Sequence, residues 1–163
     1  IRSSSSALAC VCLIICVCPA SSHVKALATL SDATFEFLTN ASSQSAKHGW
    51  LVSFGRRYCQ ECSSSRIELG KIELDLESAN IFPAHCDFDD SGMTWARFGI
   101  KKAPTLIYFS HGVMYRYSGN IVAKDLLKFA KSPDVEGELV PNELSFFQKL
   151  WLSFRPKIFR TEL

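Results

Sequence analysis

The stretch LVSFGRRYCQEC, residues 51–62, joins a short apolar run to two cysteines that lie three positions apart. Residues 50–54 are almost continuously apolar and are bounded by glycines, which predicts a buried β-strand. After Cys59, apolar residues recur at helical spacing among charged ones, which predicts a helix that begins near this cysteine. Cysteines at this spacing serve as a redox couple, as half of a metal site or as a structural clip.

The predicted position of Cys59 at a helix N-terminus favours the redox use. Unpaired backbone N–H groups and the positive end of the helix dipole stabilise a thiolate, which is the species that attacks a disulfide. Cys62, nearly one helical turn later and more buried, is placed to attack the mixed disulfide and release the product. A purely structural disulfide over so short a loop would stabilise the fold weakly, because it removes little entropy from the unfolded chain.

The composition is that of one domain of ordinary size. The 163 residues carry 18 Lys and Arg against 16 Asp and Glu, which leaves a net charge of +2. This balance gives no electrostatic reason to expect a nucleic-acid partner. The length is sufficient to close a hydrophobic core without disulfide staples.

The N-terminal segment has the pattern of a secretory signal peptide. Residues 7–18, ALACVCLIICVC, are apolar throughout and are followed by a proline and small residues. This pattern predicts that residues 1–22 are a signal peptide, with cleavage near His23. An uncleaved N-terminal anchor is the alternative, although the apolar run is short for a membrane span.

Removal of this segment changes the cysteine count. Only Cys59, Cys62 and Cys86 would remain, which are too few for a disulfide framework and leave at least one thiol unpaired. The triplet Asn40-Ala41-Ser42 is a candidate glycosylation site and fits the same compartment.

Hydrophobic periodicity alternates between strand and helix patterns along the predicted mature domain, residues 23–132. Strands are expected at 23–30, 50–54, 81–88, 105–109 and 112–119, and helices at 33–39, 59–76, 91–100 and 121–130. A turn at Ser110-His111-Gly112 pairs the last two strands as a hairpin. The order βαβαβαββα predicts a three-layer α/β/α domain with a mixed central sheet.

Three stretches, LVSFGRRYCQEC, HCDFDD and FGIKKAPTLIYFSHG, together resemble the thioredoxin superfamily. The chain is most similar to protein disulfide isomerase-like members, including the thioredoxin-related transmembrane proteins. The resemblance implies a thioredoxin fold in which Cys59 is the nucleophile and Cys62 the resolving thiol. It also implies a cis Ala103–Pro104 bond beside the pair, where Ala103 and Pro104 bind substrate. Tyr58 would form an aromatic wall for substrate or pack against the domain.

The residues around the cysteines depart from the family pattern. Gln60 and Glu61 stand between them, where isomerases have Gly-His and thioredoxins have Gly-Pro. Glu61 should raise the pKa of the nucleophile, while Arg56, Arg57 and the helix end should lower it. The absence of the histidine makes strong oxidising power less expected than in an isomerase.

Two further departures concern proton transfer. Ser53 stands where the family usually carries a buried acid that relays protons to the second cysteine, and a serine hydroxyl is no general base near neutral pH. Ile121 stands where isomerases tend to have an arginine that helps the buried cysteine to ionise. Release from a mixed disulfide is therefore expected to be slow.

The metal alternative uses Cys59, Cys62, His85 and Cys86 as a Cys₃His set. Adjacent residues on a strand point to opposite faces, so His85 and Cys86 converge poorly on one ion. Cys86 is instead expected to be a small buried hydrophobe, and the four histidines are expected at surface or turn positions. We therefore expect no metal and no cofactor.

Residues 133–163 form a tail beyond the predicted domain. Apolar residues from Leu144 to Phe154 recur at roughly helical spacing with basic residues nearby, which predicts an amphipathic helix at a membrane surface or an extra helix that covers the domain. The last four residues, RTEL, resemble the Lys-Asp-Glu-Leu retention signal. The expected location is the lumen of the endoplasmic reticulum, with secretion or membrane association as alternatives.

Two functions follow from these observations. The first is a secretory-pathway thiol-disulfide oxidoreductase of the protein-disulfide reductase or isomerase type. Its partners would be thiol- or disulfide-containing client proteins, with glutathione or another oxidoreductase as redox partner. The alternative is a thioredoxin-fold module that binds clients or a partner with little redox turnover.

Overall fold

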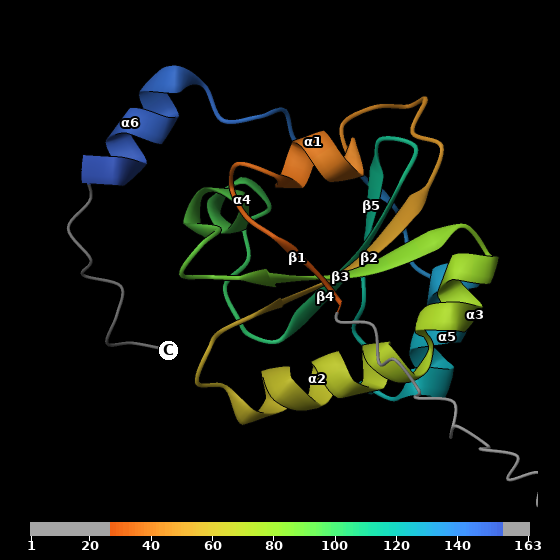
Figure 1. The fold of residues 1–163 in the computed structure, drawn as a ribbon. Coiled ribbons are helices and arrows are strands. Elements are labelled where there is room, and N and C mark those ends of the chain that lie inside the picture. Colours follow the sequence, from red (N-terminus) through yellow and green to blue (C-terminus); the bar gives the residue numbers. More distant parts are fainter. Residues whose placement is uncertain (1–26, 155–163) are drawn as a thin grey trace, which may run out of the picture.

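The computed structural model describes residues 27–154, and a six-stranded mixed sheet forms its middle layer (Figure 1). The strands are β1 (Ala28–Leu30), β2 (Gly49–Gly55), β3 (Ile81–Asp87), β4 (Thr105–Ser110), β5 (Val113–Arg116) and β6 (Glu138–Leu139). Their order is β1-β3-β2-β4-β5-β6. The first three strands in this order run parallel, and the remaining pairs are antiparallel. The predicted signal peptide and the RTEL sequence lie outside the described residues.

Helices cover both faces of the sheet. One face carries α1 (Phe35–Thr39) and α4 (Gly92–Arg97), and the other carries α2 (Gln60–Lys71), α3 (Glu73–Ser78) and α5 (Ala123–Lys131) (Figure 1). The predicted three-layer α/β/α architecture is confirmed. A last helix, α6 (Phe146–Phe154), follows a long connection on the α1 and α4 side. No helix in this part of the chain is long and apolar enough to cross a membrane.

Strand alternation divides the core into two clusters. On the α1 and α4 side, Phe54 and Cys86 pack with Phe35 and Trp95. On the opposite side, Leu51 packs with residues of α2, α3 and α5. Successive strand residues therefore serve different layers, and this alternation decides which side chains lie beneath α2.

The hairpin between β4 and β5 confirms the predicted turn. Ser110 pairs with Val113, and the two-residue loop His111-Gly112 has positive φ angles of 52° and 75°. Two successive positive φ angles are the geometry of a type I′ turn, whose twist matches that of the flanking strands.

Two features differ from the sequence prediction. The long helix expected after Cys59 is interrupted at Ile72, where α2 ends and α3 follows. Gly70 precedes the interruption, and glycine has low helix propensity. The sheet also continues into the segment beyond residue 132, because β6 pairs with β5 and Val140 is buried in the core.

Candidate active site

Cys59 and Cys62 form a disulfide at the N-terminus of α2, with their Cα atoms 5.2 Å apart. Cys59 is the N-cap residue and has an extended backbone, and its Sγ accepts a hydrogen bond of 3.1 Å from the backbone N–H of Cys62. Cys59 is partly exposed, whereas Cys62 is fully buried. A reactant in solution can therefore reach the first sulfur but not the second.

The Ala103–Pro104 peptide bond is cis, as the sequence predicts, and it lies at the same end of the sheet as the disulfide. Phe54, near the end of β2, pairs with Thr105 at the start of antiparallel β4. The loop that leads to Cys59 and the residues just before β4 therefore meet at one edge. The Thr105 hydroxyl donates to the Lys102 carbonyl oxygen at 2.6 Å and closes the turn around the cis bond.

The residues that flank the disulfide on α2 are open to solvent. Tyr58, just before the disulfide, is 97% exposed, which removes the interpretation that it packs against the domain. Gln60 and Glu61 are exposed in the first turn of the helix.

The two arginines before the cysteines make contacts with other groups. The Arg56 guanidinium lies 4.6 Å from the centre of the Phe88 ring and 5.9 Å from that of Trp95, a cation–π arrangement. Arg57 lies 3.9 Å from the Asp90 carboxylate in an exposed pair, which contributes little to stability. Both arginines thus fix the loop after β2 against the segment after β3.

Three buried polar residues, Ser53, Ser65 and His85, lie between the sheet and α2 near the disulfide. Ser53 brings a hydroxyl, and no carboxylate, to this place. The Ser53 and Ser65 hydroxyls, both fully buried, lie 2.9 Å apart in a hydrogen bond that joins β2 to α2. His85 pairs with Ser53 in the parallel β2–β3 register and is 5% exposed. The expectation that the histidines lie on the surface or in turns is therefore wrong for His85.

His85 was missed because a single polar residue in an apolar strand carries no sequence signal of its own. The predicted strands at 50–54 and 81–88 could have pointed to His85 if their pairing had been known. As parallel neighbours in the sheet they bring Ser53 and His85 side by side. That register is set by the whole sheet, and neither strand sequence specifies it alone.

The residues of the alternative metal set do not converge. Cys86 is buried in the cluster on the α1 and α4 side, while its neighbour His85 faces α2. Burial raises the pKa of the Cys86 thiol to about 12, so this residue packs as a hydrophobe, as expected. Across residues 27–154, no group of three or more His, Cys, Asp or Glu side chains is arranged to hold a metal ion.

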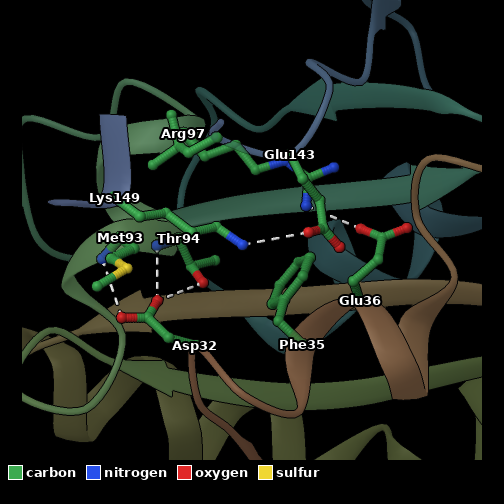
Figure 2. A pocket seen from close by; sticks show the side chains of 9 residues that line it. Asp32, Phe35, Glu36, Met93, Thr94, Arg97, Glu143 and Lys149 are labelled. Atoms are coloured by element: carbon green, nitrogen blue, oxygen red, sulfur yellow. Dashed lines mark hydrogen bonds and ion pairs between the residues drawn. The ribbon is translucent and has the colours of Figure 1, made fainter. Parts of the chain in front are cut away.

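A small hollow on the other face lies among α1, α4 and the segment leading into α6 (Figure 2). Its charged side chains satisfy one another. The pairs are Asp32 with the backbone N–H groups of Met93 and Thr94, Glu36 with Arg97, and Glu143 with Lys149. We assign these contacts a structural role, because each carboxylate already has its partner.

Comparison with known proteins identifies the family. The family model described as Thioredoxin matches residues 26–132. The chain belongs to the thioredoxin family. A thioredoxin domain-containing protein of Theileria parva is 30% identical over 124 residues, which cover 74% of this chain and 56% of that protein. The chain thus spans about half the length of this curated relative.

Solved structures show the same thioredoxin fold. The zinc-bound form of human ERp44 has a TM-score of 0.55 and 20% identity, and the likeness covers 63% of this chain and 30% of that one. The J-Trx1 fragment of ERdj5 has a TM-score of 0.53 and 20% identity, with 64% and 49% covered. At these identities the likeness concerns the fold alone.

The structure shows the surroundings of Ser53 and Ile121, the two residues that depart from the family pattern. Ser53 bonds to Ser65 at the position where the family places its buried acid. Ile121 is half-buried and packs against the cluster beneath α2, α3 and α5. The chain therefore keeps the family's cysteine pair and cis-proline while it lacks the family's usual proton relay.

Proposed function

We propose that this chain is a thiol-disulfide oxidoreductase that acts on protein disulfides in the secretory pathway. The observation that carries the proposal is the cysteine pair at the start of α2, with Cys59 partly exposed and Cys62 buried. One sulfur is accessible for attack, and the other can only complete an exchange within the molecule. A structural clip would need no such division.

The exchange proceeds in two steps. The Cys59 thiolate attacks a client disulfide, so that a bond forms between Cys59 and one client sulfur while the other client sulfur leaves as a thiolate. Cys62 then attacks Cys59, the intramolecular disulfide forms, and the second client sulfur departs. Two electrons pass from the dithiol to the client, and glutathione or another oxidoreductase restores the dithiol. The reverse sequence oxidises a client.

The cis-proline loop and Tyr58 supply the client groove in this proposal. Ala103 and Pro104 are half-buried, and the start of β4 that follows them lies in register with the end of β2 that leads to the disulfide. In this proposal the backbone of Ala103 pairs with an extended client segment. Tyr58, which is exposed next to Cys59, offers an aromatic face to the client side chains.

The secretory location rests on sequence features. The segment 1–22 has the pattern of a signal peptide, and RTEL resembles a retention sequence, which together favour the lumen of the endoplasmic reticulum. Asn40, the candidate glycosylation site, is exposed at the C-terminal end of α1 and is sterically open to modification.

A redox titration tests the proposed function. We would use the full chain with Cys10, Cys12, Cys16 and Cys18 replaced by serine, here called the four-serine protein, in glutathione buffers, and count alkylated thiols by mass. We expect Cys59 and Cys62 to interconvert readily, with a midpoint near or below about −180 to −210 mV, the poise of the endoplasmic reticulum. Cys59→Ser should abolish exchange. A pair that stays locked in one state would refute the proposal.

The second candidate is a client-binding module with little turnover. The specific observation that favours it is the serine pair Ser53 and Ser65, which offers no general base beneath Cys62. Such a module would bind an unfolded client equally well after Cys59→Ser, whereas an enzyme that captures its client covalently would lose that complex.

A further inference from the structure

His85 is a buried polar group to which the exchange cycle has so far given no role. The residue is 5% exposed, and neither Nδ1 nor Nε2 makes a hydrogen bond of normal geometry with a described residue, although the Ser53 backbone and the Asp87 carboxylate lie nearby. Leaving a buried polar group unpaired costs about 1 to 3 kcal/mol. A buried histidine that lowers the stability of the fold in this way is a candidate for a chemical role.

The imidazole lies next to the resolving cysteine. A Cβ atom built on Gly55 would be 2.9 Å from Cε1 of His85, 3.0 Å from Cβ of Cys62 and 3.4 Å from its Sγ. The ring and the sulfur therefore flank the same small space above Gly55. Because Gly55 has no side chain, β2 places nothing between them.

The charges around the ring suit a base. Burial, followed by the positive charge of Arg66 on α2, lowers the pKa of His85. Asp87 on its own strand and the backbone of Ser53 on β2 oppose this shift without reversing it. The Asp87 carboxylate lies 3.9 Å from Nε2, within ion-pair range but beyond a hydrogen bond. The ring is thus neutral near pH 7, and a carboxylate stands ready for the imidazolium.

The remaining surroundings add no other base. Arg66, Asp87 and Cys62 are the charged or titratable groups that face the ring in the described part of the chain. The neighbouring strand β2 contributes Ser53, and β1 contributes Thr29 in register with His85. Neither hydroxyl accepts a proton at neutral pH.

We propose that His85 is the general base that takes the proton of Cys62 when the client is released from the mixed disulfide. The inference deepens the proposed function and rests on it. His85, on the strand next to Ser53, would perform the proton transfer that the Ser53 hydroxyl cannot perform. The ring nitrogens are not in hydrogen-bond contact with the sulfur in this disulfide state, so a rotation of the ring toward the Cys62 thiol, once the disulfide is open, completes the path.

The proposed step balances. The Cys62 thiol gives its proton to the neutral imidazole, and the resulting thiolate attacks Sγ of Cys59. A bond forms between the two cysteine sulfurs, the bond between Cys59 and the client sulfur breaks, and its electron pair leaves on the client thiolate. The imidazolium, stabilised by Asp87, returns its proton to solvent, from which the client thiolate takes one.

The test separates the two steps of the cycle. The reduced four-serine protein is mixed with a peptide whose cysteine is bonded to thionitrobenzoate. Release of thionitrobenzoate, followed by absorbance, reports the attack by Cys59. Release of the peptide, followed by acid quench and mass, reports the attack by Cys62. His85→Gln should slow peptide release about 100-fold, the lower end of general-base contributions, and should change the first step less than twofold.

The matched control is His48→Gln, because His48 is an exposed histidine. It should leave both steps unchanged. Peptide release by His85→Gln within threefold of the unsubstituted protein would overturn the role of His85, and so would an equal loss in both steps, which indicates disturbed packing. Failure of the unsubstituted protein to release thionitrobenzoate would instead refute the proposed function, and the inference with it.

A second measurement needs no substitution at His85. Peptide release by the unsubstituted protein should slow as the pH falls, because an imidazolium cannot accept the Cys62 proton. The midpoint should lie below 6.5 and coincide with the midpoint of the His85 Cε1–H signal in an NMR titration. A release rate that does not follow the His85 titration would overturn the proposal even if His85→Gln fails to fold.

Discussion

Gly55 has no side chain, and this allows His85 and Cys62 to approach each other closely. Gly55→Ala would place a methyl group 2.9 Å from Cε1 of His85 and 3.0 Å from Cβ of Cys62, closer than side chains pack. Since both neighbours are buried, we expect a loss of about 1 to 3 kcal/mol in the free energy of unfolding, measured by urea denaturation.

Gly70→Ala is the control for this substitution. Gly70 lies within α2, and a Cβ there would have no atom within 4 Å. Alanine should stabilise the helix by about 0.5 to 1 kcal/mol. If the two variants change stability by the same amount and sign, the close approach at Gly55 is not the cause.

Single residues were predictable where a motif names them. Cys59 and Cys62 follow from a short local pattern, and the cis bond before Pro104 follows from the resemblance to the thioredoxin superfamily. The structure places all three at one end of the sheet. His85 did not follow from any pattern. Its burial and its unpaired ring depend on β2, β3 and α2 together, and no local window of sequence contains that information.

At the scale of elements, Arg97 ties α4 to two other parts of the chain. Its nearly buried guanidinium donates to the Glu36 carboxylate at 2.8 Å, to the Pro141 carbonyl oxygen and to the Ser42 hydroxyl. Burial raises the pKa of Glu36, but the hydrogen bond from the Ser42 backbone and the contacts with Arg97 outweigh it, so this pKa lies below its ordinary value.

Glu36→Gln should therefore show a pH-dependent loss of stability. Because the folded-state pKa is lowered, the ionised carboxylate stabilises the fold above about 4.5, and this contribution disappears as the pH falls through the folded-state pKa. We expect a loss of about 2 kcal/mol at pH 7, the range for a hydrogen-bonded charge, and a smaller one at pH 3, from urea unfolding at both values.

Glu143→Gln provides the comparison, since Glu143 pairs with Lys149 in an exposed position of the same hollow. Its loss should be at most about 1 kcal/mol at pH 7. A difference between Glu36→Gln and the unsubstituted protein that is the same at both pH values would contradict the stabilising role of the ionised carboxylate.

Elements with a strong local period were predicted well. The central strands confirm the prediction because continuous apolar runs mark strands that are buried on both faces, and the β4–β5 hairpin confirms it because the turn residues lie between two such strands. The two-residue strand β6 was missed. It exists through its pairing with β5, and two residues carry no period.

At the scale of the whole molecule, the two core clusters place chemically similar cysteines in different environments. Cys59 and Cys62 lie at the sheet end beneath α2, and Cys86 lies in the cluster under α1 and α4. The layer order followed from the alternation of strands and helices, but the assignment of each cysteine to a layer required the register of β2 and β3.

This separation predicts the labelling of the native protein. In the reduced four-serine protein, an alkylating reagent should add rapidly to Cys59, which is partly exposed, and not to Cys62 or Cys86, which are both fully buried. Burial also raises the pKa of the Cys86 thiol to about 12, so this residue should be the least reactive of the three. Mass spectrometry should show one rapid adduct in the native state and three adducts in denaturant. Three adducts formed at one rate in the native state would contradict the buried position.

The slow adduct on Cys86 then reports the opening of the molecule over time. Cys86 can react only when the interior opens, so the slow appearance of that mass counts opening events in an otherwise undisturbed molecule. Ligands or redox states that hold the sheet closed would lengthen the interval before it appears. Alkylation of Cys86 thus measures how often the interior opens, without an added dye.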